Sequence, residues 1–346
     1  MGFSLVELLT VMFIISLLIG LLLPSLNRAR RAAKKSATLA TLHALKAGLD
    51  MFRNDHERDF RQTNGYPPSF AHPKMPHVTT FDGYLGQFPF IDSTPPPVVT
   101  GAHWLPAMLL GIDGQGYVQR STVPTTNNLP AEPWRWYAPP PDGPDPPLKR
   151  SALYVDPRGL NLKRTDTLPG KRDETLLQDY EKIKHLPVIA DPFDQPILYY
   201  VASANGRTSN MLSEARNEDN LYSGGPQEKG PPYYFHQDNH AFTGHAEQGQ
   251  TDYDGGWNFG SGGHAISRAG DQLSAEDIKD EANRDTFARF ILDRKQYQSL
   301  QLAETNPSAS TPLRPVNQDS YLLISAGADG RYGTNDDVTN FPTSVE

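Results

Sequence analysis

The chain has 346 residues, of which 37% are apolar, and its net charge at pH 7 is -8. It contains no cysteine, which excludes disulfides, thiolate metal sites and thiol nucleophiles. Apart from one short basic cluster near the start, no basic face suited to nucleic acid stands out. The length is sufficient for one sizeable soluble domain with large insertions.

The first part of the chain is an apolar segment long enough to cross a membrane. Residues 3–23 number 21, and at about 1.5 Å of rise per residue they form a helix of roughly 30 Å, the thickness of a bilayer's hydrocarbon core. The segment contains one acid, Glu7, and an ionised acid in hydrocarbon costs about 2.5 to 3.5 kcal/mol. Glu7 is therefore either an acid favoured by the helix dipole and interfacial water, or a functional group that a partner neutralises.

These N-terminal residues resemble the processing and assembly signal of type IV pilins and type II secretion pseudopilins. The resemblance rests on Gly2, Phe3 and Glu7, followed by the apolar run. It implies that a prepilin peptidase cleaves after Gly2 and methylates the new amino terminus at Phe3. It also implies that Glu7 pairs with the terminal ammonium of a neighbouring subunit, which relieves the burial of both charges. Pro24 fits this pattern, because proline disrupts a helix and the family's helix loosens at this position during assembly.

Two features depart from the family pattern. Prepilin leaders carry lysine or arginine before the glycine, whereas only Met1 precedes Gly2 here, so we expect a late-assigned start or a trimmed leader. Basic residues that follow a span usually stay in the cytoplasm, and here they are Arg28, Arg30, Arg31, Lys34 and Lys35. We follow the family orientation, with the N-terminus in the cytoplasm and the C-terminal region outside. The basic cluster could also touch anionic lipid headgroups.

The helical pattern continues beyond the proline. Helix-forming alanines accompany an apolar stripe at steps of three and four residues, made of Leu39, Leu42, Leu45, Leu49 and Phe52. We therefore assign residues 1–27 to the signal and transmembrane helix and residues 28–60 to its amphipathic continuation. The glycine and prolines of residues 64–68 end the helix. Its apolar stripe requires a packing partner, which in the pilin plan is a sheet.

Residues 61–150 form a Pro- and aromatic-rich insertion. They contain 18 of the 31 prolines, which predicts irregular but packed loops. Within them, residues 101–111 are expected to form a short helix with Pro106 near its first turn. The glycines of residues 111–116 lack the lysine and the flanking elements of a phosphate loop. Buried packing is the preferred interpretation of the tryptophans, with ligand binding as the alternative.

Residues 151–204 are predicted to belong to a sheet. Short apolar runs indicate strands, two in this region and one near the C-terminus, at 152–155, 197–201 and 321–324. The turn before the middle run resembles the Asp-Pro-aromatic-Gly-x-Pro turn of major pseudopilins, with Asp194 in place of the glycine. We expect a structural turn held by Asp191, Pro192 and Pro196, because Asp tolerates turn conformations and Pro presets the backbone.

Residues 205–315 form a second, polar insertion. A partial capping box at Ser274 and the apolar residues after it predict a helix over about 274–301. Three histidines in this insertion could be zinc ligands: His236, His240 and His245. Their spacing matches no known zinc motif, so we prefer roles in packing or at the solvated surface. Residues 252–256 resemble a fragment of a calcium loop without its closing acid, and we interpret them as a turn.

The final segment, residues 316–346, combines a last strand with an acidic, glycine-rich loop. Its glycines allow a tight backbone with inward carbonyl oxygens, and calcium takes six to eight hard oxygen ligands. A solvated acidic turn is the alternative. The spacing resembles the calcium loop of the type II secretion major pseudopilin, which implies as ligands Asp329, Asp336, Asp337 and the backbone of Ala326, with Asn335 as a further candidate donor.

The predicted fold class is α+β and pilin-like: a long N-terminal helix, half in the membrane and half amphipathic, packed on a small antiparallel sheet with two large insertions. No catalytic motif is present, so we predict a non-enzyme. The resemblance implies a pseudopilin of the inner membrane that assembles into a periplasmic or extracellular filament. Its implied partners are copies of itself, other pseudopilins, the prepilin peptidase, the assembly platform and membrane lipid. The alternatives are a minor pilin or tip adhesin for a surface or glycan, and a surface enzyme with a pilin-type anchor.

Overall fold

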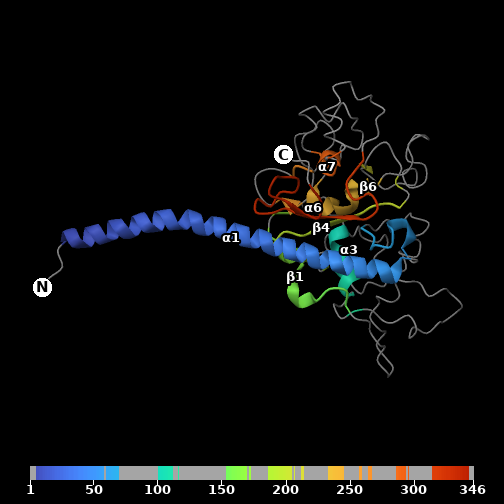
Figure 1. The fold of residues 1–346 in the computed structure, drawn as a ribbon, viewed down its shortest axis with the longest axis horizontal. Coiled ribbons are helices and arrows are strands. Elements are labelled where there is room, and N and C mark those ends of the chain that lie inside the picture. The colour runs from blue at the N-terminus through green and yellow to red at the C-terminus, as the bar shows by residue number, and fades with distance from the viewer. Residues whose placement is uncertain are drawn as a thin grey trace, which may run out of the picture.

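The protein consists of one long helix whose C-terminal half lies on a mixed α/β domain (Figure 1). The computed structural model describes residues 5–57, 60–69, 100–111, 116, 153–169, 171–172, 186–204, 206, 212–213, 233–244, 257–258, 264–266, 286–293, 295 and 314–342. The predicted pilin-like fold class is confirmed, since a long N-terminal apolar helix packs on small antiparallel sheets.

Helix α1 (Leu5–His56) is 52 residues long and continuous, as the sequence predicts. Its first half is exposed, whereas its second half buries one face made of Thr38, Leu42, Leu45, Gly48, Leu49, Phe52 and His56. The helix ends slightly before the predicted position. A 3-10 turn η1 (Arg61–Thr63) follows, and the chain then reverses through Asn64 and Gly65 with φ angles of 55° and 85°.

The central sheet has the order β4-β8-β9 and is antiparallel throughout. Its strands are β4 (Leu198–Val201), β8 (Tyr321–Ser325) and β9 (Val338–Thr339). Tyr199 pairs with Leu323, and Ser325 pairs with Val338. The strands predicted at 197–201 and 321–324 are therefore confirmed.

Smaller strand pairs surround this sheet. Strands β1 (Asn161–Arg164) and β3 (Pro187–Ala190) form an antiparallel pair, and a second antiparallel pair joins β2 (Lys171–Arg172) to β7 (Trp257–Asn258). Strands β5 (Leu212–Ser213) and β6 (Tyr234–Phe235) pair in parallel. Two 3-10 turns flank β1, η4 (Pro157–Gly159) and η5 (Thr165–Thr167).

The strand predicted at 152–155 is wrong for the part that the structure describes. Residues 153–155 form a bend, because the amide of Tyr154 donates to the carbonyl of Leu109 at 3.1 Å instead of to a neighbouring strand. The apolar residue Val155 lies directly against Gly48 of α1, where any side chain on the glycine would collide with it. The apolar run therefore serves a close helix contact.

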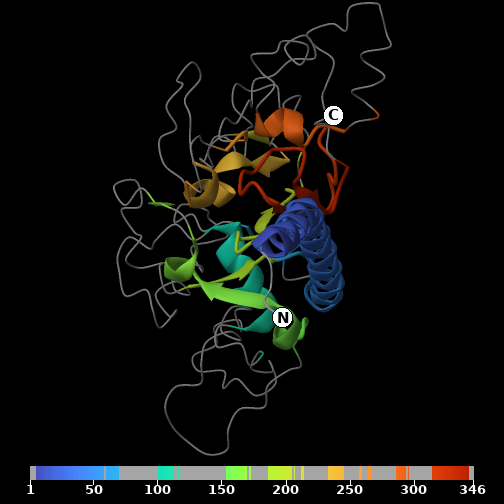
Figure 2. The ribbon, with the colours of Figure 1, turned by 90° about the vertical axis from the view of Figure 1, so that its left-hand side faces the viewer.

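Both faces of the central sheet are covered, which explains why every residue of β4 and the first four residues of β8 are apolar. The odd-numbered residues of β4 and β8 pack with the docked face of α1 and with α3 in one core. The even-numbered residues pack in a second core with side chains from 234–292 and with the C-terminal loop. Figure 2, which looks along the projecting half of α1, shows the C-terminal segment beside the helix.

Helix α3 (Gly101–Leu110) confirms the short helix expected at 101–111, but Pro106 lies in its middle and not near its first turn. Every residue of α3 is buried. Trp104 lies in the core that α3 shares with α1, in agreement with the packing role expected for it. The imidazole of His103 bridges the hydroxyls of Thr100 and Thr165 at 2.7 and 2.9 Å. Burial lowers the pKa of His103 to about 3, so this bridge is neutral. The described part of the first insertion is thus integral to the core.

The continuous helix expected over about 274–301 is wrong. Thr286 is extended and caps a single turn, α7 (Phe287–Phe290), by accepting the amide of Arg289 at 3.3 Å. The chain then leaves the helix, because Leu292 forms a bridge with Pro315 and the amide of Val316 donates to the carbonyl of Ile291 at 2.8 Å. The expected start at Ser274 lies outside the described residues. Another single turn, α6 (His240–Thr243), follows η6 (His236–Asn239).

Candidate assembly helix and acidic C-terminal loop

The projecting half of α1 is an exposed apolar rod. Large apolar side chains from Leu5 to Leu26 are 44–75% exposed. Within the described residues, α1 is the one helix long and apolar enough to cross a membrane. The acid Glu7 lies in its first turn, while Gly2 and Phe3 lie outside the described residues. An exposed apolar surface of this size is typical of a membrane or protein interaction site.

Pro24 lies inside α1 without ending it. A proline removes one backbone donor and crowds the preceding turn, and the hydroxyl of Ser25 donates to the carbonyl of Leu22 at 2.7 Å beside it. The helix therefore stays continuous in the single chain. Loosening at Pro24 during assembly stays a prediction.

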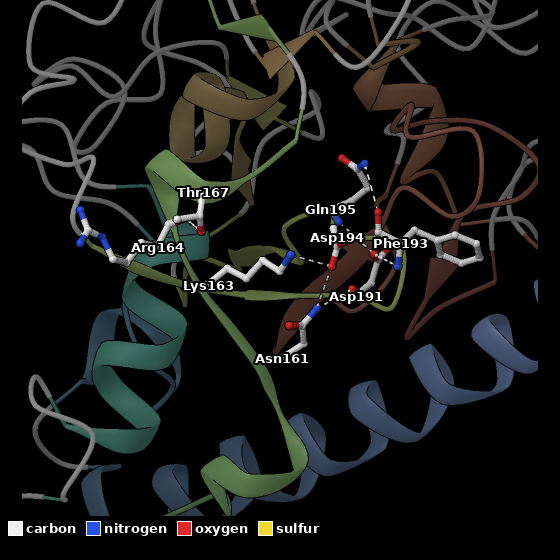
Figure 3. Close-up of polar contacts among 8 residues, drawn as sticks. All are labelled: Asn161, Lys163, Arg164, Thr167, Asp191, Phe193, Asp194 and Gln195. Carbon is white, nitrogen blue, oxygen red and sulfur yellow. Dashed lines mark hydrogen bonds and ion pairs between the residues drawn. The ribbon is translucent and has the colours of Figure 1, made fainter.

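The turn predicted at 191–196 joins β3 to β4 and is organised by a buried carboxylate (Figure 3). One oxygen of Asp191 accepts the amides of Phe193 and Gln195 at 2.8 and 3.0 Å. The other accepts the hydroxyl of Ser325 at 2.5 Å, which ties the turn to β8. Burial raises the pKa of Asp191, and these hydrogen bonds oppose the increase. The carboxylate thus acts on the turn's own backbone.

Asp194 occupies the position at which the resembled turn has glycine. Its φ angle is 69°, the left-handed region that glycine favours and that Asp tolerates. Its carboxylate forms an ion pair with the ammonium of Lys163 at 2.8 Å and accepts a hydrogen bond from the side-chain amide of Asn161 at 3.2 Å (Figure 3). The hydrogen bond from Lys163 lowers the pKa of Asp194. The departure from the family pattern is therefore accommodated by contacts to β1.

The same turn sets where the domain meets α1. The ammonium of Lys34 lies 4.8 Å from the ring centroid of Phe193, at the tip of the turn. A cation over an aromatic ring is a favourable contact, worth about 0.5–1 kcal/mol at an exposed site. The first buried residue of α1, Thr38, follows one turn later. The projecting part of the helix therefore begins near Lys34.

The C-terminal loop folds around its three acids. One oxygen of Asp336 accepts the amides of Ala328 and Asp329 at 2.7 and 3.0 Å, and the other accepts the hydroxyl of Thr334 at 2.7 Å. Asp337 is buried and accepts the amide of Gly333 at 2.7 Å. The loop thus closes on itself through carboxylate to backbone hydrogen bonds.

Two glycines are required for this closure. Gly327 has a φ angle of 67°, and a side chain there would collide with the backbone of Asp336. Gly333 has a φ angle of 93°, and a side chain there would collide with Ile266. Left-handed conformations are strained for residues with a Cβ, so the loop path depends on glycine at both positions.

The acids are close enough to influence one another. Burial raises the pKa of Asp337 well above its ordinary value, and the charges of Asp329 and Asp336 add to the increase. Burial also raises the pKa of Asp329. Burial alone would also raise the pKa of Asp336. Hydrogen bonds from Thr334 and from two backbone amides outweigh this effect, so the pKa of Asp336 is lowered. The loop concentrates negative charge that a cation would relieve.

The acids fit calcium by chemistry but do not converge on one point. Carboxylates and carbonyls on a tight loop are the oxygen donors that calcium takes. In the part of the chain that the structure describes, no group of three or more His, Asp or Glu side chains is arranged to hold a metal ion. Their oxygens accept loop hydrogen bonds instead. Ala326 is buried and Asn335 is exposed. Calcium binding therefore requires some of these hydrogen bonds to be exchanged for metal contacts.

Sequence reasoning missed the residues that bring the turn and the loop together. The hydroxyl of Tyr332 donates to the carbonyl of Pro196 at 2.5 Å, and its amide donates to His264 at 3.2 Å. The hydroxyl of Ser325 holds Asp191 from the strand that leads into the loop. No local pattern identifies these contacts, because each joins residues more than 60 positions apart.

The remaining predicted positions are only partly described. His236 is buried, and its Nε2 lies 2.9 Å from the carbonyl of Ile266. The side chain of His240, the residue His245 and the turn expected at 252–256 lie outside the described residues. Gly116 donates its amide to the carbonyl of Leu110 at 2.8 Å. The two ends of the 111–116 segment therefore meet at the C-terminal end of α3.

Comparison with known proteins finds a partial relative. A stretch of 91 residues is 28% identical to the type II secretion system core protein G of Klebsiella michiganensis. It covers 25% of this chain and 64% of that protein, which is less than two thirds of the relative's length. No protein-family model and no solved structure matches the chain. Part of this chain is thus similar to a type II secretion protein, and its architecture is pilin-like.

Proposed function

We propose that this protein is a pseudopilin, a structural subunit of a type II secretion pseudopilus or a related type IV pilus-like filament. The observation that carries the proposal is α1, in which an exposed apolar half with a single acid continues into a half that docks on a small antiparallel sheet. Such a rod cannot remain exposed in water, and it is suited to membrane storage and then to packing against other copies. The partial similarity to a type II secretion core protein supports the same function.

In this proposal the chain is stored in the inner membrane as a single-pass protein, with its domain outside the cytoplasm. Prepilin peptidase cleaves after Gly2 and methylates Phe3. Glu7 then pairs with the amino terminus of a neighbouring subunit, because each charge offsets the burial of the other in apolar surroundings. The assembly platform adds subunits, and other pseudopilins complete the filament. The role is structural and not enzymatic.

Substitution of Glu7 tests the proposal. Glu7→Gln keeps the size of the side chain and removes its charge, so we expect processing to continue and fibres to be absent in the native host. Glu57→Gln is the matched control, since Glu57 is an exposed acid just beyond the other end of α1. Fibres from the control and none from Glu7→Gln support the proposal, together with a methylated phenylalanine at the mature amino terminus. Normal fibres from Glu7→Gln would refute it.

We also propose that the C-terminal loop binds calcium through Asp329, Asp336, Asp337 and the carbonyl of Ala326, with Asn335 as a further donor. The proposal is supported by the loop's three acids together with its positive-φ glycines, which bring these carboxylates onto one tight loop. The bound ion would neutralise the loop and stabilise the fold by mass action. Its contribution belongs to stability and assembly.

Limited proteolysis of the full chain in detergent tests calcium binding. We expect calcium to slow cleavage near the C-terminus and a chelator to restore it. Asp336→Asn should lose this protection, whereas Asp319→Asn, an exposed acid outside the loop, should keep it. Equal cleavage of the unmodified chain with calcium and with chelator argues against the site.

A further inference from the structure

A basic segment follows the apolar half of α1 directly. It spans residues 28–35, and its five basic side chains are all exposed: Arg28, Arg30, Arg31, Lys34 and Lys35. No acid lies on α1 between Glu7 and Asp50. The charge of the helix itself is therefore purely positive at the point where it would leave a membrane, and Asp194 on the neighbouring turn is an acid that interacts with Lys34.

The basic side chains occupy one side of the helix. At about 100° per residue they fall within roughly 160° of the circumference, and the opposite side carries small residues, Ala29, Ala32, Ala33 and Ser36. Their side is the one that becomes buried further along α1, beginning at Thr38. Lys34 touches the ring of Phe193 on that side. The basic segment therefore lies on the domain side of α1, between the docked half of the helix and its apolar half.

Distance along the helix places the first basic residues of this segment within side-chain reach of the headgroups. The apolar run ends at residue 23, so Arg28 lies about 7.5 Å and Arg31 about 12 Å beyond it at 1.5 Å per residue. The polar zone on each side of a bilayer is about 5–7 Å deep. Helical side chains tilt toward the N-terminus, here toward the membrane, and long basic side chains extend to reach polar partners.

We propose that residues 28–35 bind the headgroups of anionic phospholipids. This inference rests on the membrane anchor of the proposed function and adds a lipid partner to it. Positive charge at the membrane surface attracts anionic headgroups. Each basic residue in contact raises the affinity for them by about fivefold. Because Lys34 also contacts the turn at Phe193, headgroup binding would hold the domain close to the bilayer at a defined height.

A second copy of the chain is the competing partner. The exposed acids Asp50 and Asp55 lie at the far end of α1 and Glu57 directly follows it. A staggered neighbour would bring these acids near residues 28–35. Asp55 already accepts the hydroxyl of Tyr154 at 2.8 Å. The headgroups lie within reach in every membrane-inserted subunit, whereas the acids require an assembled neighbour. Lipid is therefore the partner of the stored subunit.

The test uses energy transfer from the full chain to labelled lipid in nanodiscs that hold one copy each. The chain has no cysteine, so Ser25→Cys provides a unique dye position beside the basic segment. The acceptor is headgroup-labelled phosphatidylglycerol or phosphatidylcholine at equal amounts. Arg28→Gln with Arg31→Gln removes two charges from the segment. Lys46→Gln with Arg158→Gln removes two exposed charges far from the membrane and is the matched control.

We expect stronger transfer to phosphatidylglycerol, a preference that falls with salt and drops by up to about 30-fold in the Arg28 and Arg31 variant. The control should keep its preference within about twofold. Equal transfer to both lipids, an equal loss in both variants, or a preference confined to discs with two copies would overturn the inference and leave the anchor intact. No transfer to either lipid would instead remove the anchor, and the proposed function with it.

Discussion

Replacement of Asp191 tests how much its buried carboxylate, and the turn that it organises before β4, contribute to the free energy of unfolding. The side chain is fully buried and accepts hydrogen bonds from Phe193, Gln195 and Ser325 at 2.8, 3.0 and 2.5 Å. A hydrogen bond to a charged group contributes about 1.5–3 kcal/mol, and burial of the carboxylate offsets part of the sum. We expect Asp191→Ala to lower the free energy of unfolding by about 3–5 kcal/mol.

A graded series separates this effect from a general loss of an acid. Asp191→Asn keeps one oxygen for the two amides and avoids burial of a charge, so we expect a loss of about 1 kcal/mol. Asp156→Ala is the control, because Asp156 accepts one amide, that of Arg158, at 2.9 Å in an exposed turn. Its loss should stay below about 1 kcal/mol.

The assay is urea unfolding of the full chain in detergent, followed by tryptophan fluorescence and by near-ultraviolet circular dichroism. Coincident transitions from the two probes would justify a two-state free energy. The reasoning fails if Asp191→Ala is no less stable than Asp156→Ala. It also fails if Asp191→Asn is as unstable as Asp191→Ala, since the backbone amides would then contribute nothing.

Two further predictions concern the docked helix and the acidic loop. Phe52→Ala should lower the free energy of unfolding by about 3–5 kcal/mol, because this side chain is fully buried. Met51→Ala, whose side chain is 52% exposed, should change it by about 0.5 kcal/mol or less. Similar losses in the two variants would contradict the assignment of Phe52 to the buried face of α1. The raised pKa of Asp337 means that the folded state binds its proton more tightly than the unfolded chain. Without calcium, thermal stability should therefore fall as pH rises from the ordinary Asp range through the raised pKa. Asp337→Asn should flatten this dependence, and an unchanged slope in the variant would refute the assignment.

The second core explains the structural role of the described parts of the second insertion, whose side chains cover one face of the central sheet. A sheet with one face on α1 would leave Tyr200, Leu322 and Ile324 exposed to water. Side chains from residues 234–292 and from the C-terminal loop cover them. The described parts of the insertions therefore help to form the core of the fold. Substitutions in them should shift the turn at 191–196 and the acidic C-terminal loop.

Much of this arrangement follows from local pattern. The spacing of Leu42, Leu45, Leu49 and Phe52 predicts which face of α1 is buried, because helical periodicity places them on one side. The apolar runs of β4 and β8 and the Asp-Pro turn between strands are likewise encoded within a few residues. These features need no knowledge of distant contacts.

Other features arise from contacts between distant residues. The run ending at Val155 is apolar like a strand but packs on Gly48. The helix expected over about 274–301 is interrupted by the extended Thr286 and by the pairing of Leu292 with Pro315. Asp329, Asp336 and Asp337 are recognisable as acids, yet which oxygens bond the loop backbone depends on how the loop closes. A sequence window records local preference, whereas these outcomes are set by long-range packing and hydrogen bonding, which override it.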